Sequence, residues 1–254
     1  MQKTEVNFEM KLVSSLEKVF LDEIPVYRPE CMVLTGLKGE TVSFQAACTT
    51  DSFAKERVDV VLESPIREYM HIRSVENVPV GRACCPKVDD NYLKTTSGMY
   101  PDLLRELKEG KADIFPGKWR SLWIDIEIPE DMEPGMYDIR ISLTKDGDML
   151  CRADTQIRIF DAVLPKQKIM HTEWFYPDCL ADYYQVPVFS EEHWKIIENF
   201  LHEYVKRGGN MILTPLFTPA LDVAVGKERT TTQLVDVKVK RSRIVAMSFC
   251  EPRS

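Results

Sequence analysis

The sequence predicts a mainly β protein, in which a β-sandwich over residues 1–165 precedes a single βαβ unit that begins at residue 166. Upstream of Pro165, apolar and polar side chains alternate with the period of two that is typical of strands. Downstream, the period changes to the 3.6 that is typical of an amphipathic helix. The length of 254 residues allows one or two domains, and the 44% apolar and 29% charged content is that of ordinary globular proteins.

The clearest strands are three consecutive segments that begin at Leu122, Tyr137 and Cys151. Turn residues separate them, with PEDMEPG after the first and KDGD after the second. We expect these segments to form a meander with one buried face. Weaker alternation over residues 42–48 and 58–62 adds further strands. Because a sheet with one apolar face must bury it against a second layer, a sandwich is the economical architecture.

Residues 81–117 show the least periodicity. They predict a long excursion over the sandwich that contains a short helix at residues 101–109.

The strongest helix signal lies between residues 190 and 207. Ser190 is a good N-cap, and Phe189 and Trp194 have the spacing of a hydrophobic staple. Apolar side chains recur every three or four residues along one face, and Gly208 is a typical residue at a helix C-terminus.

Two apolar-rich segments flank this helix, residues 169–175 before it and residues 211–213 after it. A loop of about fourteen residues, 176–189, joins the first strand to the helix. This order predicts a βαβ unit with parallel strands and a right-handed crossover. After Pro219 the sequence offers one or two further strands and, from about residue 238, an irregular tail.

Composition and charge exclude several classes of function. The formal net charge of −7 and the pI of about 5.3 argue against nucleic acid or an anionic membrane as a partner, because both need a basic face. No apolar run approaches the about 18 residues that a membrane span needs. The N-terminus lacks the apolar core of a signal peptide, so we expect a cytoplasmic protein.

The cysteines and histidines predict neither a metal site nor a cofactor. The seven cysteines are scattered and contain no C-x-x-C pair, which favours free thiols in a reducing compartment. Of the four histidines, His193 and His202 fall on opposite sides of the predicted helix. We expect His171 to be a core residue of the first strand of the βαβ unit.

Five segments together resemble glycoside hydrolase family 123. SLEKVFLDEIP near the start is similar to the opening strand of that family's N-terminal domain, and WIDIEIPEDMEPGMYDIRI with FDAVLP is similar to its last hairpins. HTEWFYPDCLADYY and KRGGNMILTPLFTP are similar to the first and second strands of the family's catalytic barrel. The resemblance spans about residues 10–220.

The resemblance implies a sandwich followed by a (β/α)₈ barrel, of which residues 166–254 would be the beginning. It implies hydrolysis of β-linked N-acetylhexosamine glycans, with N-acetylgalactosamine as the expected sugar, by substrate-assisted retaining hydrolysis. In the family, an aspartate orients the acetamido group that attacks the anomeric carbon, and the adjacent glutamate protonates the leaving oxygen. Two carboxyl groups thereby take distinct roles.

No catalytic residue can be carried over to this sequence. The family's Asp-Glu pair lies beyond the second barrel strand, whereas the only Asp-Glu dipeptide here is Asp22–Glu23, in a turn of the sandwich. We therefore expect a truncated chain, by gene structure or frameshift, that is inactive alone. Its incomplete barrel would leave residues 211–213 as an open edge, through which we expect self-association.

Substrate-binding candidates follow from the barrel, in which ligands meet the C-terminal ends of strands. Aromatic rings stack on sugar faces, and carboxylates accept hydrogen bonds from hydroxyl groups. The alternative for each candidate is plain packing, with Glu173 paired to a nearby base. The candidates are Glu173, Trp174, Tyr176, Asp178, Thr214 and Phe217, with Asp182, Tyr183 and Tyr184 on the same loop.

A second class of function stays open, a non-catalytic carbohydrate-binding or structural sandwich module. Trp119 and Trp123 could form an aromatic platform for it, although the sequence favours a buried, core position for Trp123.

Overall fold

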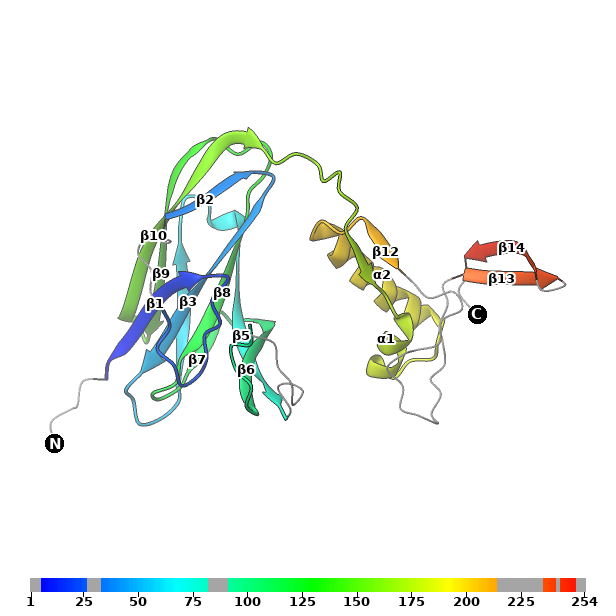
Figure 1. Ribbon diagram of the computed structural model, residues 1–254. Coiled ribbons are helices and arrows are strands. Elements are labelled where there is room, and N and C mark those ends of the chain that lie inside the picture. Colours follow the sequence, from blue (N-terminus) through cyan, green and yellow to red (C-terminus); the bar gives the residue numbers. More distant parts are fainter. Residues whose placement is uncertain (1–5, 27–32, 82–90, 214–234, 241–242, 250–254) are drawn as a thin grey trace. The chain divides into compact units, whose positions relative to one another are not determined.

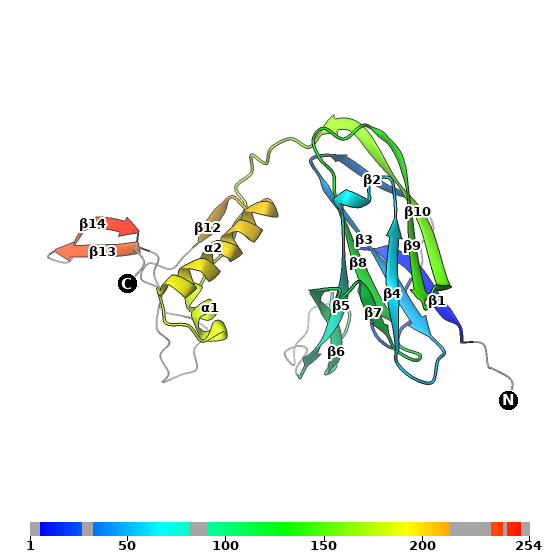
Figure 2. The same cartoon turned by 180° about the vertical axis from the view of Figure 1, so that it is seen from behind.

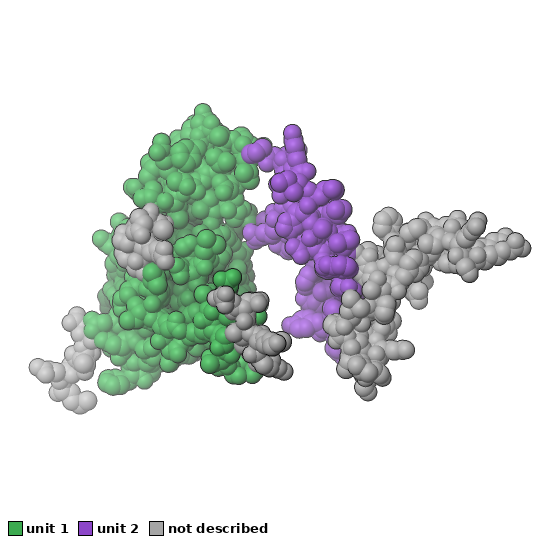
Figure 3. Space-filling model, in the orientation of Figure 1, with its two compact units in different colours: residues 1–164 green, residues 165–254 purple. Residues whose placement is uncertain are grey.

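The computed structural model describes residues 6–26, 33–81, 91–213, 235–240 and 243–249. The chain divides into two compact units, residues 1–164 and residues 165–254, which Figure 3 shows in different colours.

Unit 1 is a sandwich of two five-stranded sheets with the orders β1-β3-β8-β5-β6 and β2-β10-β9-β4-β7 (Figures 1 and 2). Neighbouring strands are antiparallel except β2 and β10, which are parallel. This confirms the predicted sandwich. The strands are β1 (Phe8–Ser14), β2 (Val33–Lys38), β3 (Thr41–Thr50), β4 (Glu56–Glu63), β5 (Met70–Val80), β6 (Gly98–Glu106), β7 (Lys111–Ile114), β8 (Arg120–Glu127), β9 (Gly135–Lys145) and β10 (Asp148–Val163).

The core between the sheets consists of the apolar residues of the alternating pattern. Phe44, Ile124, Ile141 and Ile157 are completely buried. Burial of each such side chain contributes about 1.5–3 kcal/mol. Burial also raises the pKa of the thiols of Cys48 and Cys151, the latter to about 11, so both are held protonated and unreactive.

The three best strands do not form one meander, which corrects the prediction. β9 and β10 pair as a hairpin, with Ile139 opposite Thr155, but β8 lies in the other sheet between β3 and β5. The segment PEDMEPG therefore crosses from one layer of the sandwich to the other. Alternation reports only that one face of each strand is buried, and both sheets bury theirs against the same core.

Two further local predictions are wrong. Residues 101–109 are not helical, because β6 (Gly98–Glu106) pairs with β5 along the edge of the first sheet. Pro101 is tolerated there because the strand is an edge strand and its register shifts beside Asn77. The opening strand is β1 (Phe8–Ser14), whereas residues 15–25 form a turn and connecting segment.

The expectation that Trp123 is a buried core residue is wrong, and Trp119 is the buried tryptophan of the sandwich. Trp119 is buried in a small cluster with Val13, Val19 and Ala47. Trp123 is half-buried on β8, and its Nε1–H donates to Asp125 Oδ1 at 2.8 Å. The pair therefore forms no shared platform.

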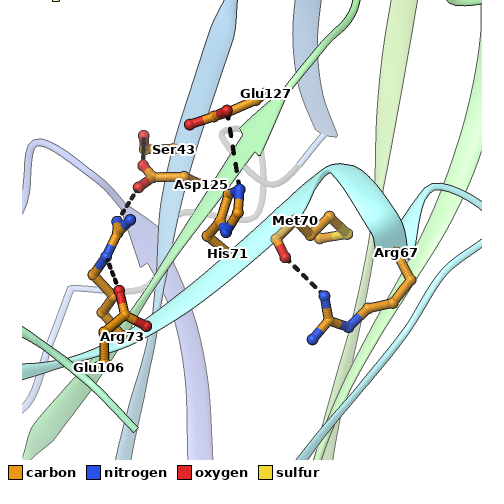
Figure 4. A network of polar contacts seen from close by, with 8 residues as sticks. All are labelled: Ser43, Arg67, Met70, His71, Arg73, Glu106, Asp125 and Glu127. Carbon is orange, nitrogen blue, oxygen red and sulfur yellow. Dashed lines mark hydrogen bonds and ion pairs between the residues drawn. The ribbon is translucent and has the colours of Figure 1, made fainter. Parts of the chain in front are cut away.

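A buried carboxylate ties four strands of the first sheet together (Figure 4). Asp125 on β8 accepts hydrogen bonds from Ser43 on β3 (2.6 Å) and from Arg73 on β5 (2.5 Å) as well as from Trp123. The Arg73 Nε–H also donates to Glu106 on β6 at 2.8 Å. Burial alone would raise the pKa of Asp125, but the hydrogen bonds from Ser43, Trp123 and Arg73 outweigh burial and hold that pKa below its usual range.

Unit 2 contains the predicted βαβ unit. Strands β11 (Thr172–Trp174) and β12 (Met211–Leu213) are parallel, with Glu173 opposite Ile212, and helix α2 (Glu191–Lys206) lies between them in sequence. Ser190 caps α2 by accepting from the His193 backbone N–H, and Phe189 stacks on Trp194 with ring centroids 5.6 Å apart. Both helix signals read from the sequence are thus confirmed.

The connection before α2 is not only a loop. It contains the helix α1 (Pro177–Tyr184), which begins with Pro177 in its first turn and ends at Gln185 in a left-handed conformation. Eight residues were too few to show a helical period. Beyond Leu213, β13 (Val235–Lys240) and β14 (Arg243–Phe249) pair antiparallel. The sequence predicts one or two strands after Pro219, but β14 lies where an irregular tail was expected, from about residue 238.

Among the described residues, no helix is long and apolar enough to cross a membrane. The same residues contain no group of three or more histidine, cysteine, aspartate or glutamate side chains placed to hold a metal ion.

Candidate functional site

The C-terminal end of β11 presents two stacked aromatic rings. Trp174 and Tyr176 lie with ring centroids 6.1 Å apart and planes inclined by 16°. The indole is largely open to solvent, with 66% of the Trp174 surface exposed. Between them, the Phe175 backbone N–H donates to the Leu213 carbonyl at 2.7 Å, which fixes the end of β11 against β12. The rings therefore stand on a hydrogen-bonded strand end.

Glu173 faces the other side of β11 and contacts a histidine. Its Oε1 lies 3.1 Å from Nε2 of His171, and both side chains are more than half exposed. The alternative in which Glu173 pairs with a nearby base is what the structure shows. The expectation that His171 is a core residue is wrong, because its side chain is exposed. His171 lies just before the first residue of β11, which in the described part of unit 2 pairs only with β12.

The candidates of helix α1 separate into an inner and an outer set. Asp178 is buried in the first turn of α1, where the helix dipole stabilises a negatively charged side chain. Asp182 and Tyr183 are exposed, and Tyr183 meets Tyr184 edge to face at 5.0 Å. Asp178 is therefore placed to stabilise α1 rather than to reach the surface of the Trp174–Tyr176 pair.

Thr214 and Phe217 lie outside the described residues. Of the six main candidates, the structure brings Trp174 and Tyr176 together and places Glu173 on the adjoining residue of β11, facing the other side of the strand.

His193 is a residue of this region to which the sequence assigned no role. It is completely buried near the start of α2. Its Nδ1 accepts a hydrogen bond from the Phe189 backbone N–H at 2.9 Å, and its Nε2–H donates to the Pro177 carbonyl at 2.8 Å. Pro177 follows Tyr176 directly, so His193 holds the segment that carries the aromatic pair. The signal was its place three residues after Ser190, inside the cap of the helix.

A small core supports this arrangement. Phe189 and Ile197 are buried, and the half-buried side chains of Phe175, Leu180 and Ile212 pack against them. The strand that carries Trp174 is thereby joined to both helices. Chemically, the site offers a stacking surface for the apolar face of a ring, and the Glu173 carboxylate lies on the other side of the strand.

Comparisons with known proteins point to one family. Residues 174–248 match the family model "Glycoside hydrolase 123, catalytic domain". No curated protein matches the sequence significantly. The match to the family model begins at Trp174, the first ring of the stacked pair.

One solved structure shares the fold over most of the chain. It is a family 123 glycoside hydrolase from Clostridium perfringens, studied for glycolipid glycan hydrolysis, with 19% identity and a TM-score of 0.63 over 82% of this chain. The alignment covers 37% of the Clostridium protein, so this chain spans well under half of its length.

Two other structures are much less similar. A β-glucosidase mutant from Listeria innocua aligns at 10% identity and a TM-score of 0.29, over 63% of this chain and 17% of that one. A cohesin from Pseudobacteroides cellulosolvens aligns at 13% identity and a TM-score of 0.25, over 55% and 94%. Residues 174–248 are thus similar to the catalytic domain of glycoside hydrolase family 123, and the chain shares the fold of a family 123 enzyme over most of its length.

Proposed function

We propose that the chain is the N-terminal portion of a glycoside hydrolase that acts on β-linked N-acetylhexosamine glycans, with N-acetylgalactosamine as the sugar, by substrate-assisted retaining hydrolysis. The observation that carries this proposal is the stacked Trp174–Tyr176 pair at the end of β11, where the match to the catalytic-domain model begins. The Clostridium relative, which hydrolyses glycolipid glycans, supports a glycan as the substrate class.

The geometry of the aromatic pair suits a sugar. A pyranose has an apolar C–H face that packs on an aromatic plane, and the Trp174 ring, which stacks on Tyr176, is largely exposed to solvent. Glu173 faces the other side of β11, where it contacts His171, so its carboxylate is not assigned to the sugar that stacks on Trp174.

No catalytic residue is proposed within this chain. The Asp22–Glu23 dipeptide lies in unit 1, and both carboxylates bind Lys94, Glu23 at 2.6 Å and Asp22 at 3.4 Å. A backbone hydrogen bond and the Lys94 ammonium lower the pKa of Asp22, which is the opposite of what a general acid needs. These two carboxylates therefore serve as an ion-pair anchor for Lys94.

The test combines binding with turnover. Methyl N-acetyl-β-galactosaminide should bind residues 1–254, and Trp174→Ala should weaken its Kd about tenfold because the stacking plane is lost. The Kd would be measured by ligand-observed NMR titration. Aryl N-acetyl-β-galactosaminide should not be hydrolysed above buffer, since a general acid alone contributes about 10²–10⁴-fold in rate.

The matched control is Phe53→Ala, which removes an almost fully exposed ring from unit 1 and should leave the Kd unchanged. Equal affinity of the Trp174→Ala protein would contradict a sugar-binding role for the pair. Turnover that survives repurification would show that catalytic residues have been missed.

We further propose that the chain self-associates through β12. In the described part of unit 2, β12 pairs with β11 on one side, and Met211 and Leu213 are each about two-fifths exposed. An open apolar edge offers backbone groups to a second strand. Light scattering should show concentration-dependent growth in mass, and Met211→Lys should reduce it because an edge lysine opposes pairing. A monodisperse monomer at all concentrations would remove this expectation.

A further inference from the structure

The sandwich contains a cavity that none of the catalytic-domain arguments uses. It has a volume of about 390 Å³ and lies at one end of unit 1, between the segment that follows β1, the end of β5, residues 91–94 and the start of β6. This volume lies in the range of small-ligand sites. Three of its lining residues are aromatic, Phe20, Tyr92 and Tyr100.

The back wall of the cavity is held in place. Phe20 and Tyr100 pack edge to face, with centroids 5.9 Å apart and planes at 81°. The Tyr100 hydroxyl donates to the Thr96 carbonyl, and the Lys94 ammonium lies 4.2 Å from the centre of the Phe20 ring. Because Lys94 covers the face of Phe20, this ring serves as wall rather than as a stacking surface.

Tyr92 is the ring that remains open. It is 47% exposed and takes part in none of the ring contacts among the described residues. Asn91 precedes Tyr92, and Asp102 and Lys18 line the same cavity. The exposed Tyr92 ring therefore shares the cavity with side chains that can donate and accept hydrogen bonds.

The charges at the lining disfavour an anionic ligand, and its polar groups disfavour a wholly apolar one. Asp22 and Glu23 both pair with Lys94, and Lys18 and Asp102 carry opposite charges, so the site has no excess of positive charge. An anionic headgroup would therefore gain nothing here, and an apolar peptide would leave the amide of Asn91 and the carboxylate of Asp102 unmatched. A hydroxyl-rich ring with one apolar face satisfies both kinds of surface.

We propose that this cavity is a glycan-binding site of the sandwich, in which Tyr92 stacks on a neutral pyranose while Asn91, Asp102 and Lys18 bind its hydroxyl groups. The choice of a glycan rests on the proposed function, but the site lies in unit 1 and involves none of the residues of the β11 end. It gives the chain a way to hold a polysaccharide apart from any hydrolysis.

The test uses the full 254-residue chain, labelled with ¹⁵N, and two probes, methyl N-acetyl-β-galactosaminide and N,N′-diacetylchitobiose. At least one probe should shift the amide signals of residues 91–94 and 100–102. Tyr92→Ala should weaken the Kd read from those signals about tenfold, and Asp102→Asn should weaken it less. Since Tyr92 is half exposed, its loss should leave the spectrum of the strands unchanged.

Two controls separate the outcomes. Phe53→Ala should bind like the unchanged chain, and Trp174→Ala should abolish only shifts near residue 174. Shifts at residues 174–176 without shifts at 91–102 would overturn the cavity site while leaving the proposed function intact. Shifts at 91–102 that persist in Tyr92→Ala, or no shift there with either probe, would also overturn it. Shifts at 91–102 without any at 174–176 would uphold the cavity site and count against the β11 site.

Discussion

Replacing Arg73 by methionine is expected to lower the free energy of unfolding of the sandwich by about 2–4 kcal/mol, because it leaves a buried carboxylate without its cation. The side chain of Asp125 is only 4% exposed and that of Arg73 is 20% exposed, so little water is available to replace the guanidinium. Methionine keeps much of the packing of the arginine stem. Urea denaturation followed by circular dichroism of the β-sheet band measures the change.

Arg140→Met is the matched control. Arg140 on β9 also pairs with an aspartate at 2.7 Å, but the side chains of Arg140 and Asp154 are each about half exposed. Solvent screens such a pair, and the stability should remain close to that of the unchanged chain. If both variants lost the same stability, the buried position of Asp125 would not be what matters.

The pH dependence of the folding stability provides an independent test of the hydrogen bonds around Asp125. Because the pKa of Asp125 is lowered in the folded state, its ionisation stabilises the fold above the unfolded value of about 3.9, and this contribution is lost as the pH falls through the folded pKa. In Arg73→Met the folded pKa should rise, so the loss of stability on acidification should begin at a higher pH. If the loss of stability on acidification began at the same pH in Arg73→Met, the hydrogen bonds from Ser43 and Trp123 alone would be what lowers the pKa of Asp125.

The architecture was predictable from the sequence because it follows from side-chain periods. Alternation around Ile124, Ile141 and Ile157 requires strands with one buried face, and the Ser190 cap with the Phe189–Trp194 staple marks the start of α2. Pairing was not predictable to the same degree. Nothing local distinguishes a hairpin between β8 and β9 from a crossing between sheets, since both bury the same residues.

The site was predictable only where one strand carries it. Trp174 ends β11 and Tyr176 follows it by two residues, so in an extended segment their side chains point to the same side. The roles of Trp119 and His193 depend on contacts that are distant in sequence, with Val19 and Ala47 for the former and with the Pro177 carbonyl for the latter. The cavity beside Tyr92 likewise needs four separate segments to come together, which no local pattern reports.

His193→Leu is expected to open the α1–α2 region of unit 2. Leucine approximates the volume of the imidazole but leaves the Phe189 N–H and the Pro177 carbonyl without their hydrogen bonds. Each unsatisfied buried group costs about 1–3 kcal/mol, so hydrogen exchange across residues 177–206 should accelerate by more than about tenfold. Mass spectrometry of peptides from this region measures the change, with peptides from β8 as an internal reference.

His202→Leu is the control for this change, and His193→Gln tests its cause. His202 lies on the same helix, 76% of its side chain is exposed, and its contact with Glu198 at 3.6 Å is a solvated pair, so its loss should leave exchange unaltered. Glutamine offers one donor and one acceptor and should restore part of the protection. If His193→Leu exchanged like the unchanged chain, the two hydrogen bonds would not be what closes the region.

The consequence for binding follows from the position of Pro177. Tyr176 precedes it directly, and Trp174 stacks on Tyr176, so an unpinned Pro177 carbonyl releases one ring of the pair from the other. His193→Leu should therefore weaken the Kd for methyl N-acetyl-β-galactosaminide at the β11 end, although His193 is completely buried. Binding at the Tyr92 cavity of unit 1 should be unaffected by the same change. Loss at one site with retention at the other would show that His193 acts by positioning the aromatic pair, and not by unfolding the chain as a whole.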